Sequence, residues 1–154
     1  MMNRSKSSLA VALLVLAASL CCPAQENGYW RAASTDATAI TSDIAIFGRS
    51  VSIDYISFPL AQIRKLTTAE VAAAFDADVN AGGNGTLYRL NIPAAKRFQH
   101  KNTLCGTEDT QWMATYVSGR NLQVAFFSGS DAPLFTFEAL SKSPDLCGTF
   151  TYAR

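Results

Sequence analysis

Short runs in which apolar and polar residues alternate dominate the chain after residue 43. Residues 44–47 and 51–56 are two such runs with a glycine-containing turn between them, and they predict a pair of adjacent strands. In the second run, Val51, Ile53 and Tyr55 alternate onto one face. We therefore expect all three side chains to face the core.

Further strands are predicted at 86–92 and 148–152, and a hairpin is predicted from residues 111–118 and 122–128 around a three-residue turn. The adjacent aromatic residues Phe126 and Phe127 must point to opposite faces of their strand. One of them is therefore expected to lie outside the main core, under a helix or in a partner surface.

Helical signals are fewer. Thr67 or Thr68 can cap a helix that continues to Phe75, and Glu70 stands three residues after Thr67 in the pattern of a capping box. Pro93 suits the first turn of a second short helix over 93–98. Residues 135–140 fit either a strand or a short helix.

The first 24 residues have the pattern of an export signal, with Arg4 and Lys6 ahead of an apolar run over 9–20 and small residues before Gln25. The run is shorter than the roughly 20 residues of a membrane-spanning helix. We expect cleavage after Ala24, release into the periplasm or medium, and no stable membrane insertion afterwards. Lipid attachment at Cys21 or Cys22 is the less favoured alternative, since large or cysteine residues precede both.

Removal of residues 1–24 would leave one domain over 25–154, with 11 basic and 12 acidic side chains once Arg4 and Lys6 are discounted from the 13 basic residues of the chain. This near-neutral charge gives no case for nucleic-acid binding. About six strands with two or three short helices indicate an α+β domain, mainly antiparallel β, built as a small curled or barrel-like sheet.

The tetrapeptide Leu-Cys-Gly-Thr occurs twice, at residues 104–107 and 146–149. It contains Cys105 and Cys147, the two cysteines that follow the signal, and an even pair in an oxidising compartment predicts one disulfide. The spacing lacks the C-x-x-C pattern of redox-active thiols. We therefore expect a structural bridge.

Several segments together resemble small exported proteins of Gram-negative bacteria that are known mostly as uncharacterised families. These segments are Trp30, residues 40–44 (ITSDI), 87–89 (LYR), 102–106 (NTLCG), 124–127 (VAFF) and 146–152 (LCGTFTY). The resemblance covers nearly all of the mature chain. It implies export and a compact β domain closed by a disulfide, and it transfers no catalytic residue.

Two groups of residues are candidate binding sites. Oxygen ligands at alternate positions, Asp76, Asp78, Asn80 and Asn84, resemble half of an EF-hand calcium loop, although the required glycine and bidentate glutamate are missing, so a polar loop is the favoured interpretation. The basic residues are candidate partner contacts, with a solvated surface as the alternative; they are Lys96, Arg97, His100, Lys101 and Arg120.

The sequence offers little for catalysis. It has one histidine, no nucleotide-binding or nucleophile-elbow motif, and no feature that calls for a cofactor or a zinc ion. We therefore expect a non-enzymatic binding or accessory protein that docks on, and in one version inhibits, an envelope or cell-wall enzyme. The alternatives are a small-molecule or lipid carrier and, less favoured, a hydrolase that uses carboxylates such as Asp54 with Glu108 or Asp109.

Overall fold

The computed structural model describes residues 26–78, 80 and 82–154. The expected signal segment and its cleavage site therefore lie outside the described residues. No helix in the described part of the chain is both long enough and apolar enough to cross a membrane.

Within those residues, nine strands form a single antiparallel sheet in the order β4-β3-β2-β1-β9-β8-β7-β6-β5. The strands are β1 Gly28–Ala32, β2 Ile44–Phe47, β3 Ser50–Ile53, β4 Ile56–Pro59, β5 Ala61–Leu66, β6 Asn84–Ile92, β7 Thr110–Ser118, β8 Asn121–Phe127 and β9 Leu146–Ala153. The helical elements are the π-helical turn η1 Ala37–Thr41, helix α1 Thr68–Phe75, the 3₁₀ turn η2 Gln99–Lys101 and helix α2 Phe137–Ser141.

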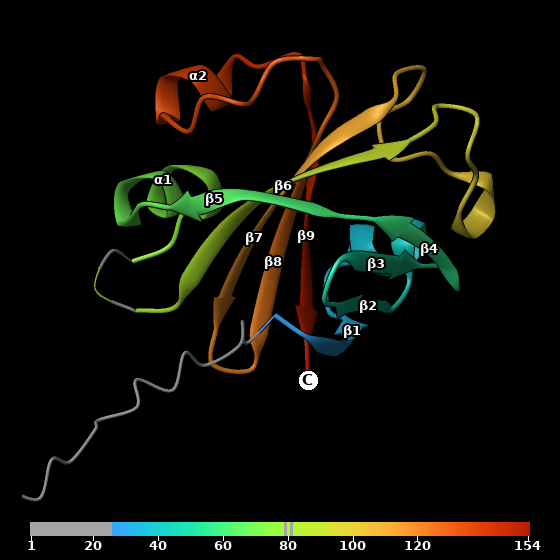
Figure 1. The fold of residues 1–154 in the computed structure, drawn as a ribbon, viewed down its shortest axis with the longest axis horizontal. Coiled ribbons are helices and arrows are strands. Elements are labelled where there is room, and N and C mark those ends of the chain that lie inside the picture. Colours follow the sequence, from blue (N-terminus) through green and yellow to red (C-terminus); the bar gives the residue numbers. More distant parts are fainter. Residues whose placement is uncertain (1–25, 79, 81) are drawn as a thin grey trace, which may run out of the picture.

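The sheet curls over itself without closing. In Figure 1 the short strands β2 and β3 run across the direction of the long strands β7, β8 and β9. The two edge strands, β4 and β5, follow each other in the chain and are not hydrogen-bonded to each other. This arrangement confirms the predicted α+β class with a curled antiparallel sheet.

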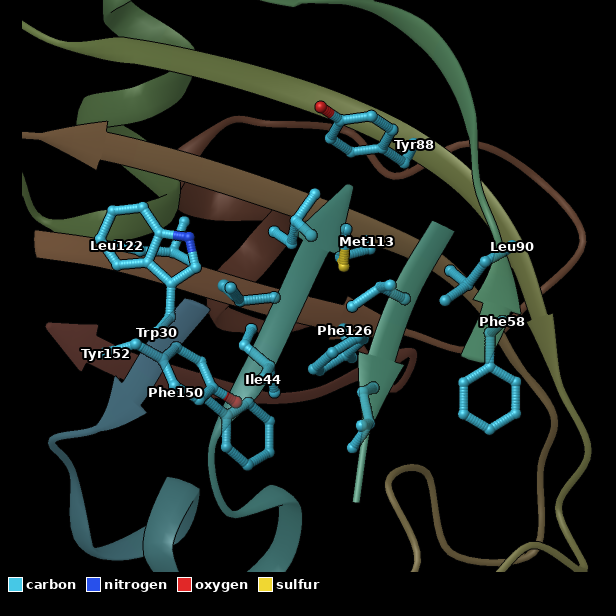
Figure 2. Close-up of a cluster of buried hydrophobic side chains, with 14 of the residues drawn as sticks. Trp30, Ile44, Phe58, Tyr88, Leu90, Met113, Leu122, Phe126, Phe150 and Tyr152 are labelled. Carbon is cyan, nitrogen blue, oxygen red and sulfur yellow. The ribbon is translucent and has the colours of Figure 1, made fainter. Parts of the chain in front are cut away.

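Two apolar clusters lie on the two faces of the sheet. The larger one fills the inside of the curl, where Trp30, Phe126 and Tyr152 are almost fully buried (Figure 2). The smaller cluster lies on the outer face beneath α1 and α2, and includes Phe75 and Phe127. The two residues of the Phe126-Phe127 pair therefore do face opposite sides, and Phe127 packs edge-on to Phe135 with the ring centres 5.8 Å apart.

Helix α1 begins as the sequence predicts. The Thr67 hydroxyl accepts a hydrogen bond from the backbone nitrogen of Glu70 at 3.3 Å, and the Glu70 carboxylate accepts one from the backbone nitrogen of Thr67 at 2.8 Å. This reciprocal capping box satisfies two backbone donors that the first turn would otherwise leave without partners. Residues 135–140, which fitted either element, lead into and form most of α2.

The predicted disulfide between Cys105 and Cys147 is present, with their Cα atoms 4.9 Å apart. It ties the long connection between β6 and β7 to the start of β9. The terminal strand predicted at 148–152 is the larger part of β9, which pairs with both β1 and β8.

The structure corrects the strand predicted at 51–56. β3 ends at Ile53, and Asp54 and Tyr55 form a two-residue turn with φ of 50° and 64° before β4 begins at Ile56. Val51 and Ile53 face the core as predicted, whereas Tyr55 is 99% exposed. Alternation alone did not reveal the turn, because Asp54 suits a positive φ but Tyr55 stands where such two-residue turns usually have glycine.

Two further elements differ from the sequence prediction. Pro93 is followed by a single turn and no helix, because Phe98 is drawn into the core against Phe58 and the chain then reverses through left-handed φ angles at His100 and Lys101. The β7–β8 hairpin has a two-residue turn, Gly119-Arg120, rather than three residues. The strand count also exceeds the expected six, since β1, β4 and β5 were not predicted as separate strands; the mostly exposed β5 shows no alternation.

Candidate functional site

The inside of the curled sheet is packed with side chains. Figure 2 shows Trp30, Met113 and Phe126 between the strands of the two halves of the sheet, and each is 0% exposed. Interiors packed in this way leave little space that a bound molecule could occupy. The remaining candidates for a functional site are the buried polar groups and the outer surface.

One carboxylate is buried inside the curl. Glu26 is 1% exposed, and its Oε1 accepts a hydrogen bond from the Thr86 hydroxyl at 2.8 Å while its Oε2 accepts one from the Tyr88 hydroxyl. Lys65 Nζ donates to the Thr86 hydroxyl at 2.9 Å, and Trp30 Nε1 donates to the backbone oxygen of Glu26 at 2.7 Å. These contacts fix the chain just before β1, and they satisfy a carboxylate that would be costly to bury alone.

Burial raises the pKa of Tyr88 well above its usual range, and the hydrogen bond to the Glu26 carboxylate raises it further. Tyr88 is therefore a stable hydrogen-bond donor at any ordinary pH. Because Glu26 has almost no contact with solvent, the cluster holds the fold together and offers no surface to a substrate. No local sequence pattern predicts this role, since nothing near Glu26 marks it as an interior residue.

The basic candidates do not form one surface. Lys96, Arg97, His100 and Lys101 lie in the connection between β6 and β7, whereas Arg120 lies in the turn at the opposite end of β7. Nine residues of strand separate these two ends by roughly 30 Å. A partner that contacted the whole set would therefore have to span the length of β7.

The calcium candidates are only partly brought together. Asp76 ends α1 in a left-handed conformation, and Asp78 uses Oδ1 to accept a hydrogen bond from the backbone nitrogen of Asn80 at 2.8 Å. Asp78 and Asn84 line one surface pocket. Across the described ranges, no group of three or more histidine, cysteine, aspartate or glutamate residues is placed to hold a metal ion.

The carboxylates considered for hydrolysis have separate positions. Asp54 lies in the β3–β4 turn and accepts a hydrogen bond from Gln99 Nε2 at 2.6 Å. Asp109 accepts one from the backbone nitrogen of Ala94 at 2.7 Å, and Glu108 is exposed in the same connection. The contacts of Asp54 and Asp109 hold loops in place.

Three aromatic side chains on the outer side of the first hairpins are exposed to solvent. Tyr29 on β1 is 77% exposed, Phe47 on β2 is 48% exposed and Tyr55 in the β3–β4 turn is 99% exposed. The rings of Tyr29 and Phe47 meet edge-on, with their centres 5.2 Å apart. We call Tyr29, Phe47 and Tyr55 the aromatic surface.

A surface pocket of about 200 Å³ lies beside this surface. Tyr29 and Tyr55 both line it, together with Asp43, Asp54, Ala45 and Ser52. Asp43 accepts a hydrogen bond from the backbone nitrogen of Ala32 at 2.9 Å, which ties β1 to the start of β2. The pocket therefore combines two exposed phenol rings with two carboxylates on a rigid part of the sheet.

The sequence did not identify this site. Alternation predicts Tyr55 in the core, and Tyr29 stands next to Trp30, which is fully buried while Tyr29 is 77% exposed. The feature that reveals the site is the hairpin register, which puts Tyr29 opposite Ala45 on the outward side of β1 and β2. That register becomes visible only once the strands are paired.

Comparison with known proteins adds no relationship: no family model, no curated protein sequence and no solved structure matches this chain.

Proposed function

We propose that the chain is an exported, non-enzymatic binding protein that docks on another component of the cell envelope through the aromatic surface. The observation that carries this proposal is Tyr55, a large aromatic residue with φ of 64° and 99% exposure in a two-residue turn. The left-handed conformation favours glycine at this position, and water is a poor environment for an aromatic ring. Neither feature helps folding, and both are explained by a partner that covers the ring.

The other two aromatic residues support the same proposal. Tyrosine and phenylalanine are enriched at protein interfaces, where a few aromatic anchors provide most of the binding energy. Tyr29, Phe47 and Tyr55 come from three different elements and gather on one side of the first hairpins. The packed interior favours such a surface over the carrier alternative, in which a ligand would lie within the curl.

The proposal can be tested by comparing three forms of the purified exported protein. Tyr55→Gly removes the ring and relieves the left-handed conformation, so this variant should fold at least as stably as the wild type. Phe137→Ser is a matched control, because Phe137 is 78% exposed on α2, away from the aromatic surface.

Each form would be used to capture components of an envelope extract, and every captured component would then be purified and its direct binding measured. We expect a component that binds the wild type and the Phe137→Ser form but binds Tyr55→Gly at least about tenfold more weakly. Equal binding to all three forms, or no direct binder, would overturn the proposal. For the version in which the partner is a cell-wall-degrading enzyme, unchanged rates across a lysozyme panel would count against inhibition.

Export itself is part of the proposal. It is supported by the Cys105–Cys147 disulfide, which persists in oxidising compartments, and by the signal-like pattern of residues 1–24. Sequencing the N-terminus of the protein recovered from the periplasm should give Gln25 as the first residue. A lipid-modified Cys21 or Cys22 would instead show an anchored form.

A further inference from the structure

The pocket beside the aromatic surface has an acidic lining. Asp43 and Asp54 each use Oδ1 inside the fold, for the backbone nitrogen of Ala32 and for Gln99 Nε2 respectively. Within the described residues, no hydrogen bond engages Oδ2 of either aspartate, and no lysine, arginine or histidine lines the pocket. The two carboxylates stand with Tyr29 and Tyr55 around a volume of about 200 Å³.

We propose that this pocket receives the guanidinium or ammonium group of an arginine or lysine side chain from a partner protein. The inference rests on the proposed function and names the chemistry by which the partner is recognised. A cation is attracted to the face of a phenol ring, and a carboxylate beside the ring adds a charge-assisted hydrogen bond. Both contributions are available in this pocket. Paired strands hold Tyr29 and Asp43, and the tight β3–β4 turn holds Asp54 and Tyr55.

The surroundings of the pocket favour a protein partner over a free small cation. The edge-on contact of Tyr29 with Phe47 extends the apolar area beyond the pocket, along β2. A small cation seated in the pocket would leave Phe47, which is 48% exposed, in water. A polypeptide can insert a basic side chain and cover Phe47 with a neighbouring apolar residue.

Basic residues near the pocket repel a bound cation. Removing one of them should therefore strengthen binding of a cation. Arg31 lies two residues after Tyr29, and continuing the β1–β2 register places it opposite Asp43. In the described structure it forms no ion pair with Asp43. On the other side, His100 and Lys101 follow Gln99, the hydrogen-bond partner of Asp54.

The first experiment is a titration of the ¹⁵N-labelled protein with Nα-acetyl-arginine amide, followed by amide chemical shifts at low ionic strength. The neutral isostere Nα-acetyl-citrulline amide is the matched control probe. We expect the arginine probe to shift amides at 43–45 and 52–55, and the citrulline probe to bind at least about fivefold more weakly. The same weak response to both probes would overturn the proposal.

Four variants then separate charge from shape. Asp43→Asn and Asp54→Asn keep the Oδ1 acceptor of the fold and should each weaken binding of the arginine probe by about fivefold. Arg31→Gln should strengthen it, whereas Asp131→Asn, an exposed aspartate outside this pocket, should leave it unchanged. A ligand recognised only by its shape would respond to none of the four, and that result would also overturn the proposal.

The source of the cation is tested with the tripeptide acetyl-Leu-Arg-Leu-amide. We expect it to bind more tightly than the arginine probe and to lose that gain in the Phe47→Ser variant. Equal binding of the two probes, with no effect of Phe47→Ser, would indicate a small-molecule cation and refute a protein partner. If neither probe shifts the pocket at millimolar concentration while Tyr55-dependent capture persists, this inference fails and the proposed docking function remains.

Discussion

The hydroxyl of Tyr88 on β6 donates a hydrogen bond to Oε2 of Glu26, which precedes β1 by two residues. The pair joins two segments 62 positions apart in sequence, and Tyr88 belongs to the larger apolar cluster. A hydrogen bond to a charged group contributes more than a neutral one, and a buried carboxylate that loses a donor keeps its desolvation penalty.

Tyr88→Phe should therefore lower the free energy of unfolding by about 2 kcal/mol. Tyr116→Phe is the matched control, because its hydroxyl donates to the neutral backbone oxygen of Gly82 at 2.6 Å and its loss should cost about 1 kcal/mol. Urea unfolding at neutral pH measures both values. Equal losses would show that the Glu26 carboxylate adds nothing to the hydrogen bond.

The ion pair at the start of α1 should make stability depend on pH in the acid range. The side-chain hydrogen bond from Arg64 lowers the pKa of Glu70 from its usual 4.5 to about 2. A carboxylate whose pKa is lower in the folded protein than in the unfolded chain stabilises the fold. This stabilisation is complete above the pKa in the unfolded chain and disappears as the pH falls through the pKa in the folded protein. The contribution should therefore be lost between about pH 4.5 and pH 2.

Glu70→Gln tests this dependence, because glutamine can still complete the capping box. We expect a loss of about 1 kcal/mol at pH 7, limited by solvent screening since the Arg64 side chain is 44% exposed. Near pH 2 the variant and the wild type should unfold at the same urea concentration. A difference that persists at pH 2 would assign the effect to the cap and not to the charge.

Helix α1 packs onto the sheet at a glycine. A Cβ atom on Gly85 would lie 2.5 Å from Val71 Cγ2 and 3.0 Å from Leu66 Cβ, closer than atoms in contact allow. Gly85→Ala should therefore destabilise the protein by about 2 kcal/mol through overpacking. Adding Val71→Ala should recover part of that loss in thermal unfolding, and purely additive losses would place the strain elsewhere.

The disulfide closes a long loop, since Cys105 and Cys147 are 42 positions apart. On the chain-entropy account, replacing both cysteines by serine should cost about 4 kcal/mol, because the unfolded chain regains the freedom to open that loop. Urea unfolding with and without reductant gives the measurement. The doubly substituted protein should not respond to reductant, and a response would point to another reducible group.

Several elements could be predicted locally because their signals lie within a few residues. Thr67 and Glu70 specify the start of α1, and the repeated Leu-Cys-Gly-Thr tetrapeptide identifies the two cysteines that pair. The prediction of a helix after Pro93 was wrong because a distant contact overrides the local pattern there. Its local spacing was suitable, but Phe98 gains more by burial against Phe58, which is 40 positions away.

The amino-acid sequence by itself determined the class of the fold, the disulfide partners and the capping of α1, because alternation, cysteine number and capping depend on neighbouring residues. Among side chains of the same chemical type, such as carboxylates or aromatic rings, only the tertiary structure decided which are buried and which are exposed. Glu26 is buried because Thr86 and Tyr88 meet it from β6, and Tyr55 is exposed because the β3–β4 register ends at Ile53 and Ile56. The first outcome depends on contacts between segments 60 or more positions apart, and the second on the point at which a hairpin turns, and apolar–polar alternation encodes neither.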